Sequence, residues 1–98
     1  MQFSRDLRPA VIAGEVTVTF RLWRRPQVRA GGRYRVGPAE IEVDSVELLP
    51  FAAIDAEDLR RAGETDLESL RARAAHAGPI DDGTPVYRIE FHRVRDRH

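Results

Sequence analysis

The chain of 98 residues has no cysteine and no lysine, so arginine supplies all sixteen of its basic side chains. The absence of cysteine excludes disulfides, thiolate metal sites and cysteine nucleophiles. The absence of lysine excludes a side-chain amine for Schiff-base or general-base chemistry. An all-arginine composition either serves the binding of phosphates and bases, on which the planar guanidinium group chelates and stacks, or reflects a GC-rich genome.

Long apolar runs are absent as well. No stretch approaches the ~20 residues that a membrane-spanning helix needs, and the start of the chain lacks the hydrophobic region of a signal peptide. The length suits one domain with a modest core. We therefore predict a single cytoplasmic domain over residues 1–98, with a frayed tail over residues 93–98.

Motifs for cofactors are missing too, because the sequence contains no Gly-rich phosphate loop, nucleophile elbow or zinc signature. Glu40, Glu42 and Asp44 alternate along one predicted strand and therefore project from one of its faces. That arrangement indicates a solvated acidic surface more than a cation site. We predict neither a cofactor nor a metal.

The net charge of zero conceals a segregation along the chain. Residues 1–37 carry eight arginines and two acidic residues, residues 38–85 carry four and twelve, and residues 86–98 carry four and two. Such asymmetry indicates a basic face for an anionic partner, unless the segments neutralise each other in the fold. A third possibility is a protein-interaction module, in which the acidic middle of a second copy meets the basic half, so we expect a monomer or a weak homodimer.

Periodicity predicts an α+β domain. The predicted strands, which alternate apolar and polar side chains, cover residues 16–23, 33–36, 40–49 and 86–94. The predicted helices, which begin near capping residues, cover residues 5–13, 55–62 and 65–77. Pro9 weakens or shifts the first helix, and Thr65 with Glu68 fits a capping box for the third. A phase break at Asp44-Ser45 predicts a β-bulge, which commonly curves a sheet toward a barrel.

Five segments resemble an ASCH domain, a small relative of the PUA-like barrels. They read AGEVTVTFRLW, VRAGGRYRV, IEVDSVELLPFAAI, EDLRRAG and VYRIEFHRV, in this order over nearly the whole chain. The resemblance implies a small mixed PUA-like β-barrel, flanked by about three helices, with a basic cleft. It also implies a link to RNA, because members of the family are linked to RNA.

The signature of that family, Gly-x-Lys-x-x-Glu-x-Arg, is only partly present. Gly14 and Arg21 match it, whereas Val16 stands at the Lys position and Thr19 at the Glu position. One branch, the N4-acetylcytidine amidohydrolases, has Thr as the proposed nucleophile, a Lys that activates it and a Glu near the helix pair. Thr19 matches that Thr and Glu64 lies near the region of that Glu, but Val16 offers no base for attack by a hydroxyl.

The predicted binding residues fall into two groups. Thr19, Arg21 and Trp23 share one strand face, where Arg21 clamps a phosphate or a pyrimidine carbonyl, Thr19 orients the ligand and Trp23 stacks on a base. The residues that supply a positive field are Arg24, Arg25, Arg29, Arg33, Arg35, Arg88 and His92. The structural alternatives are a solvated strand face, a Trp that covers the end of the barrel, and a salt-bridge ladder through Arg88, Glu90 and His92.

We conclude that the sequence favours binding of RNA, another single-stranded nucleic acid or a nucleotide-like ligand in a basic cleft. If about six phosphates are neutralised, log K falls with log salt concentration at a slope of about −4. The alternative is an enzyme of the same fold, either a ribonuclease or an N4-acylcytidine amidohydrolase with Thr19 as nucleophile.

Overall fold

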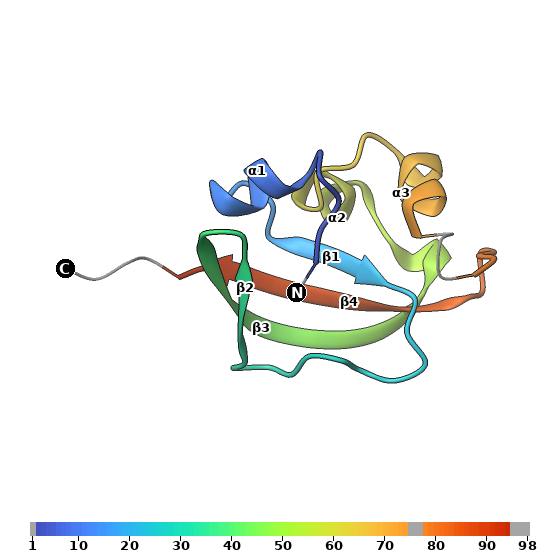
Figure 1. Ribbon diagram of the computed structural model, residues 1–98. Helices are drawn as coiled ribbons and strands as arrows, with labels where there is room; N and C mark the ends of the chain where they lie inside the picture. Colours follow the sequence, from blue (N-terminus) through green and yellow to red (C-terminus); the bar gives the residue numbers. More distant parts are fainter. Residues whose placement is uncertain (1, 75–77, 95–98) are drawn as a thin grey trace.

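Four antiparallel strands form one open sheet in the order β1-β4-β3-β2 (Figure 1). The computed structural model describes residues 2–74 and 78–94. The strands are β1 (Val18–Arg21), β2 (Arg33–Val36), β3 (Ala39–Pro50) and β4 (Pro85–Arg93). The helices are α1 (Arg8–Ile12), the 3₁₀ turn η1 (Phe51–Ala53), α2 (Ala56–Arg61) and α3 (Leu67–Ala74).

The α+β class is therefore confirmed, whereas the closed mixed barrel is wrong over the described residues. All three strand pairings are antiparallel, and β1 and β2 form opposite edges that do not pair with each other. A sheet of four strands is too narrow to curl until its two edges meet around a barrel. The predicted bulge is confirmed, because the β3–β4 register shifts between Val43 and Ser45.

Local chemistry explains where the helices begin. Pro9 lies in the first turn of α1, so α1 starts at Arg8, later than predicted. Asp55 accepts a hydrogen bond from the backbone N–H of Asp58 and caps α2, as its position predicts. Asp66, one residue after the predicted Thr65, caps α3 by accepting a bond from the N–H of Ser69. The predicted end of the third helix at residues 75–77 lies outside the described residues.

The sheet holds the first two residues of the predicted tail, Arg93 and Val94. Arg93 is the last residue of β4, and the N–H of Val94 donates to the carbonyl of Glu40 at 2.8 Å. The rest of the predicted tail, residues 95–98, lies outside the described residues. Among the helices that the structure describes, none has the length and apolar character needed to cross a membrane.

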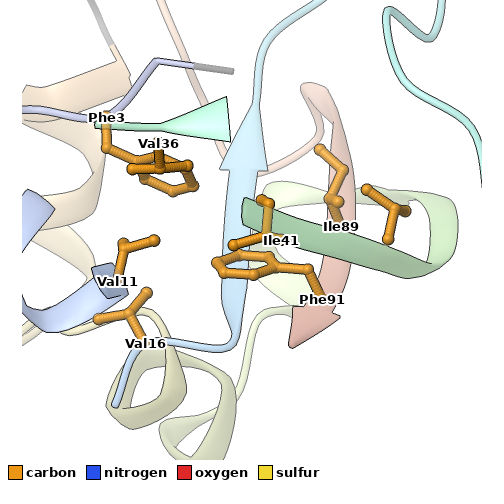
Figure 2. Packing of buried hydrophobic residues seen from close by; sticks show 8 residues of the cluster. Phe3, Val11, Val16, Val36, Ile41, Ile89 and Phe91 are labelled. Atoms are coloured by element: carbon orange, nitrogen blue, oxygen red, sulfur yellow. The ribbon is translucent and has the colours of Figure 1, made fainter. Parts of the chain in front are cut away.

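Two hydrophobic clusters pack on the sheet. The first cluster joins α1, the N-terminal segment and the strands, and Figure 2 shows its side chains converging. Its buried members are Phe3, Val11, Val16, Val36, Ile41, Val43, Ile89 and Phe91. The second cluster lies under α2 and α3, and its buried members are Val18, Phe20, Phe51, Ile54, Ala62, Leu70 and Val86. The alternation of β1 thus sends Val18 and Phe20 into the second cluster and leaves Thr19 and Arg21 on the opposite parity.

Candidate functional site

A cleft of about 390 Å³ lies beside β1, at the edge of the sheet. Its walls come from the N-terminal segment, β1 and its exit, the α2–α3 connection and α3. The side chains that give it chemical character are Phe3, Thr19, Arg21, Trp23, Glu64 and Arg73. The volume lies within the ~300–1,000 Å³ range of small-molecule sites. This cleft is therefore the candidate site.

Arg21 forms the basic wall. Its guanidinium carbon lies 4.9 Å from the centroid of the Phe3 ring and 6.0 Å from that of Trp23. Its Nη2 donates to the carbonyl of Gln2 at 2.6 Å, and its Nε donates to Oγ1 of Thr19 at 3.2 Å. Burial lowers the pKa of the Arg21 guanidinium, which nevertheless stays charged at neutral pH. No carboxylate among residues 2–74 and 78–94 pairs with Arg21, and its remaining N–H donors have no partner there.

Glu64 forms a second wall of the cleft, which is acidic where the wall at Arg21 is basic. Its side chain is only 2% exposed, and its Oε2 accepts a bond of 2.6 Å from Nε of Arg73. Its Oε1 accepts a bond of 2.9 Å from the hydroxyl of Ser69. Oε1 also accepts a longer bond of 3.4 Å from Nη2 of Arg73, so the lone pair that Glu64 retains for a ligand N–H is on Oε2.

Arg73 ties this wall to the start of the chain. Its Nη1 and Nη2 donate to the two carboxylate oxygens of Asp6, both at 3.0 Å. The bonds that Arg73 donates to Asp6 and Glu64 raise the pKa of Arg73, and the bond that Asp6 accepts from Arg73 lowers the pKa of Asp6. The two positive charges of Arg21 and Arg73 balance the two negative charges of Asp6 and Glu64, so the site is neutral overall. It is nevertheless dipolar, because Arg21 offers donors on one wall and Glu64 offers an acceptor on the other.

The structure brings together the predicted binding residues of the first strand, and the loop arginines follow them directly in the chain. Thr19, Arg21 and Trp23 all line the cleft. Residues 24–30 continue directly from Trp23 as a loop, in which Arg24, Arg25 and Arg29 are exposed. Within the part of the chain that the structure describes, the guanidinium groups of these three arginines have no hydrogen-bond or ion-pair partner.

Arg33 and Arg35 lie on β2, at the opposite edge of the sheet from the cleft. Arg33 donates to Glu42 at 3.0 Å and lies 3.7 Å from Glu40. Arg35 is exposed on the same strand. The structure therefore does not bring these two arginines to the cleft.

Arg88 and His92 lie on β4 and are also engaged elsewhere. Arg88 donates to Asp58 at 3.0 Å and to Glu90 at 3.2 Å, and its side chain is only 14% exposed. His92 contacts Asp44 at 2.9 Å. These contacts favour the salt-bridge alternative for both residues, and their role in binding stays a prediction.

One group of potential metal ligands occurs among the described residues. Ligand atoms of Glu42, Asp44 and His92 lie within 4.8 Å of one another. Arg33 already holds Glu42, and both Asp44 and His92 are exposed. These contacts favour an ion-paired strand surface.

Sequence reasoning missed the far wall of the cleft. Arg73 and Asp6 are 67 residues apart in the chain, and no spacing rule connects them. Phe3 escaped notice because one aromatic residue before a helix carries no pattern. Glu64 was noticed through the family resemblance, but the periodicity around it does not predict that its side chain is buried.

Thr19 has no neighbouring general base among residues 2–74 and 78–94. Val16, at the Lys position of the signature, is 3% exposed and packs in the first cluster. The hydrogen-bond partner of the Thr19 hydroxyl is the guanidinium of Arg21, which donates and does not take up protons at neutral pH. This geometry suits ligand orientation better than nucleophilic attack.

Comparison with solved structures shows the fold. A crystal structure of an ASCH domain from Lactobacillus crispatus JV V101 matches with a TM-score of 0.71 and 14% sequence identity, over 90% of this chain and 70% of that one. A crystal structure of a DUF984 protein from Enterococcus faecalis V583 matches with a TM-score of 0.68 and 16% identity, over 91% and 67%. No protein-family model matches the sequence, and no curated protein matches it significantly.

Proposed function

From its ASCH-domain fold and the cleft beside β1, we propose that the protein binds single-stranded RNA with one base seated in the cleft. The observation that carries the proposal is Arg21, a partly buried guanidinium set near two aromatic rings with no carboxylate partner among the described residues. Partial burial of a charge without a carboxylate partner costs free energy, and a further acceptor on a ligand offsets part of that cost.

The dipolar character of the cleft fits a nucleobase. A base is a flat ring whose edge carries both acceptors and donors, and its faces stack on aromatic side chains. Arg21 supplies donors to a base carbonyl, Glu64 supplies an acceptor to a base N–H, and Trp23 supplies a ring. The sugar and phosphates then extend toward the loop, where Arg24 and Arg25 provide free cations.

The ion pairs of the fold change the expected salt dependence. Arg33 and Arg88 are engaged by carboxylates, which leaves the three loop arginines to neutralise phosphates. For single strands the slope of log K against log salt is about −0.7 per phosphate, so we expect a slope of about −2 and not −4.

The decisive experiment titrates a fluorescently labelled single-stranded RNA with the wild-type protein, Arg21→Ala and a control, Arg60→Ala. Loss of charged hydrogen bonds to the base predicts an affinity about 10- to 100-fold lower for Arg21→Ala. Arg60 pairs with Glu57 on the exposed side of α2, so its variant should bind as the wild type does. Equal affinities for all three proteins, or no binding by any, would contradict the proposal.

Hydrolysis is tested in the same preparation. Protein incubated with N4-acetylcytidine should leave it unchanged, because no base faces Thr19 among the described residues, and RNA is incubated in parallel as the second substrate. A product that disappears in Thr19→Ala would establish the amidohydrolase instead, and RNA cleavage that survives this substitution would establish a ribonuclease.

A further inference from the structure

A row of side chains leads out of the cleft across the sheet. Arg21 of β1 lies directly opposite Tyr87 of β4, and Tyr87 lies directly opposite Leu48 of β3. Directly paired residues of antiparallel strands project from the same face. Since neighbouring strands are ~4.8 Å apart, the row extends about 10 Å from Arg21 to Leu48.

Trp23 joins this row to the cleft. Its ring lines the cleft, and its centroid lies 6.2 Å from that of Tyr87 with the planes tilted by 41°. Beyond Tyr87, Leu48 is 55% exposed, which makes it the one large hydrophobic residue that is exposed among those described. Trp23, Tyr87 and Leu48 therefore form a continuous apolar strip, which we call the strand strip.

The loop arginines lie over the same face as the strand strip. The loop leaves β1 at Trp23 and returns at Gly31, whose N–H donates to the carbonyl of Val43 on β3. Val28, within the loop, packs against the first cluster, as do Trp23 and Tyr87. Figure 1 shows the loop passing on the side of the sheet away from α2 and α3. The loop that carries the exposed arginines thus packs through Val28 against the same cluster as Trp23 and Tyr87.

We propose that the strand strip is a second subsite, which holds the base next to the one in the cleft. The inference rests on the proposed function and deepens it: the ligand is a strand of at least two nucleotides, and a free nucleotide fills only half of the site. Tyr87 and Leu48 contact the second base, and Arg24 and Arg25 contact the phosphates.

Two physical reasons select nucleic acid for this surface. Bases stack on aromatic rings displayed by antiparallel sheets, whatever their sequence. The bordering charges are positive and lack carboxylate partners among the described residues, so they complement a phosphate backbone. Arginine beside an apolar strip also distinguishes this surface from the ion-paired face under α2.

The test compares a mononucleotide with a short strand. Uridine 5′-monophosphate is titrated by following the fluorescence of Trp23, the single tryptophan of the chain, and a labelled uridine hexamer by anisotropy. The variants are Leu48→Glu, which places a charge on the exposed end of the strip, and Tyr87→Leu, which removes the ring but keeps an apolar side chain. The control is Ala56→Glu, the same added charge at the exposed start of α2.

We expect Leu48→Glu to bind the hexamer about tenfold more weakly than the wild type, with unchanged affinity for the mononucleotide. Tyr87→Leu should weaken hexamer binding in the same direction, and Ala56→Glu should match the wild type for both ligands. Circular dichroism of each variant verifies the fold.

Four outcomes would overturn the second subsite. If Leu48→Glu binds the hexamer as the wild type does, the strip holds no base, although loss of binding in Arg21→Ala would still support the cleft. If Leu48→Glu weakens binding of the mononucleotide and the hexamer equally, the substitution disturbs the cleft and gives no support to a second subsite. If the free wild-type protein is a dimer in light scattering and Leu48→Glu is a monomer, the strip is an interface between copies. If the wild type binds neither ligand, the proposed function fails and this inference fails with it.

Discussion

Arg21 and Arg88 are neighbours in space and opposites in environment. They lie at adjacent positions of the paired strands β1 and β4 and project to opposite faces. Arg88 meets Asp58 and Glu90, whereas Arg21 meets a carbonyl, a hydroxyl and two aromatic rings. The difference arises because Asp58 of α2 and Glu90 of β4 lie on the face of Arg88, whereas no carboxylate among the described residues pairs with Arg21. The availability of these two arginines to a ligand therefore depends on the face of the sheet from which each projects.

The face under α2 is a closed ion network. Arg61 donates to Glu90 at 2.8 Å and to the hydroxyl of Thr17 at 3.1 Å, which links α2 to β1 and β4. Together with Arg88 and Asp58 this makes two cations and two anions. Such a network has no charge left for a ligand, and its value lies in holding α2 on the sheet.

The sharpest way to break the comparison is Arg88→Ala. Removing one partner of a buried ion pair leaves Asp58, whose side chain is 13% exposed, without compensation. We expect the free energy of unfolding to fall by about 3 kcal/mol, measured in urea, with RNA affinity unchanged. Arg60→Ala removes an exposed pair with Glu57 and should leave the free energy of unfolding nearly unchanged, because exposed ion pairs contribute little to stability. Weaker RNA binding at unchanged stability would instead make Arg88 a binding residue, as the sequence predicts.

Substitutions in the loop test whether unpaired arginines contact phosphates and paired arginines do not. Replacing Arg24 and Arg25 together by Ala should make the slope of log K against log salt shallower by about 1.4, since each removes one phosphate contact of a single strand. Arg33→Ala is the matched control, because Glu42 already engages that guanidinium. A larger change in slope for the control than for the double variant would refute the assignment of the free cations to the loop.

The smallest expected effect is a loss of folding stability at low pH. The bond from Arg61 lowers the pKa of Glu90 below its usual value of 4.5. Folding therefore disfavours protonation of Glu90, and the stability that it contributes above pH 4.5 is lost as the pH falls through its lower folded pKa. Because the side chain is 33% exposed, the contribution should stay below about 1 kcal/mol.

Urea midpoints of the wild type and Glu90→Gln at pH 6, 4 and 3 check this. The wild type should lose stability faster than the variant as the pH falls. Parallel decreases in the two proteins would show that Glu90 does not take part in the acid sensitivity.

Short-range patterns predicted most of the fold. The alternation of residues 16–23 placed Thr19 and Arg21 on one parity, and the phase break at Asp44 located the bulge. Barrel closure was not predictable, because the alternation does not show how much of a segment pairs in the sheet. β1 stops at Arg21, although the alternation continues to Trp23.

The site was predictable on one wall only. Thr19, Arg21 and Trp23 follow from one strand, so a single periodicity places all three. The ion pair between Arg88 and Asp58 was not predictable, because Asp58 is 30 residues away on a helix whose packing no local pattern reveals. Glu64 and Arg73 became part of the cleft only through the packing of α3 against the start of the chain.

The assembly order of the cleft has a consequence during protein synthesis. β1 is the first strand to emerge from the ribosome, yet its neighbour in the sheet is β4, the last strand to be made. The opposite wall, at Glu64 and Arg73, likewise emerges long after Phe3 and Arg21. A nascent chain therefore has no finished cleft until β4 has been made and has paired with β1.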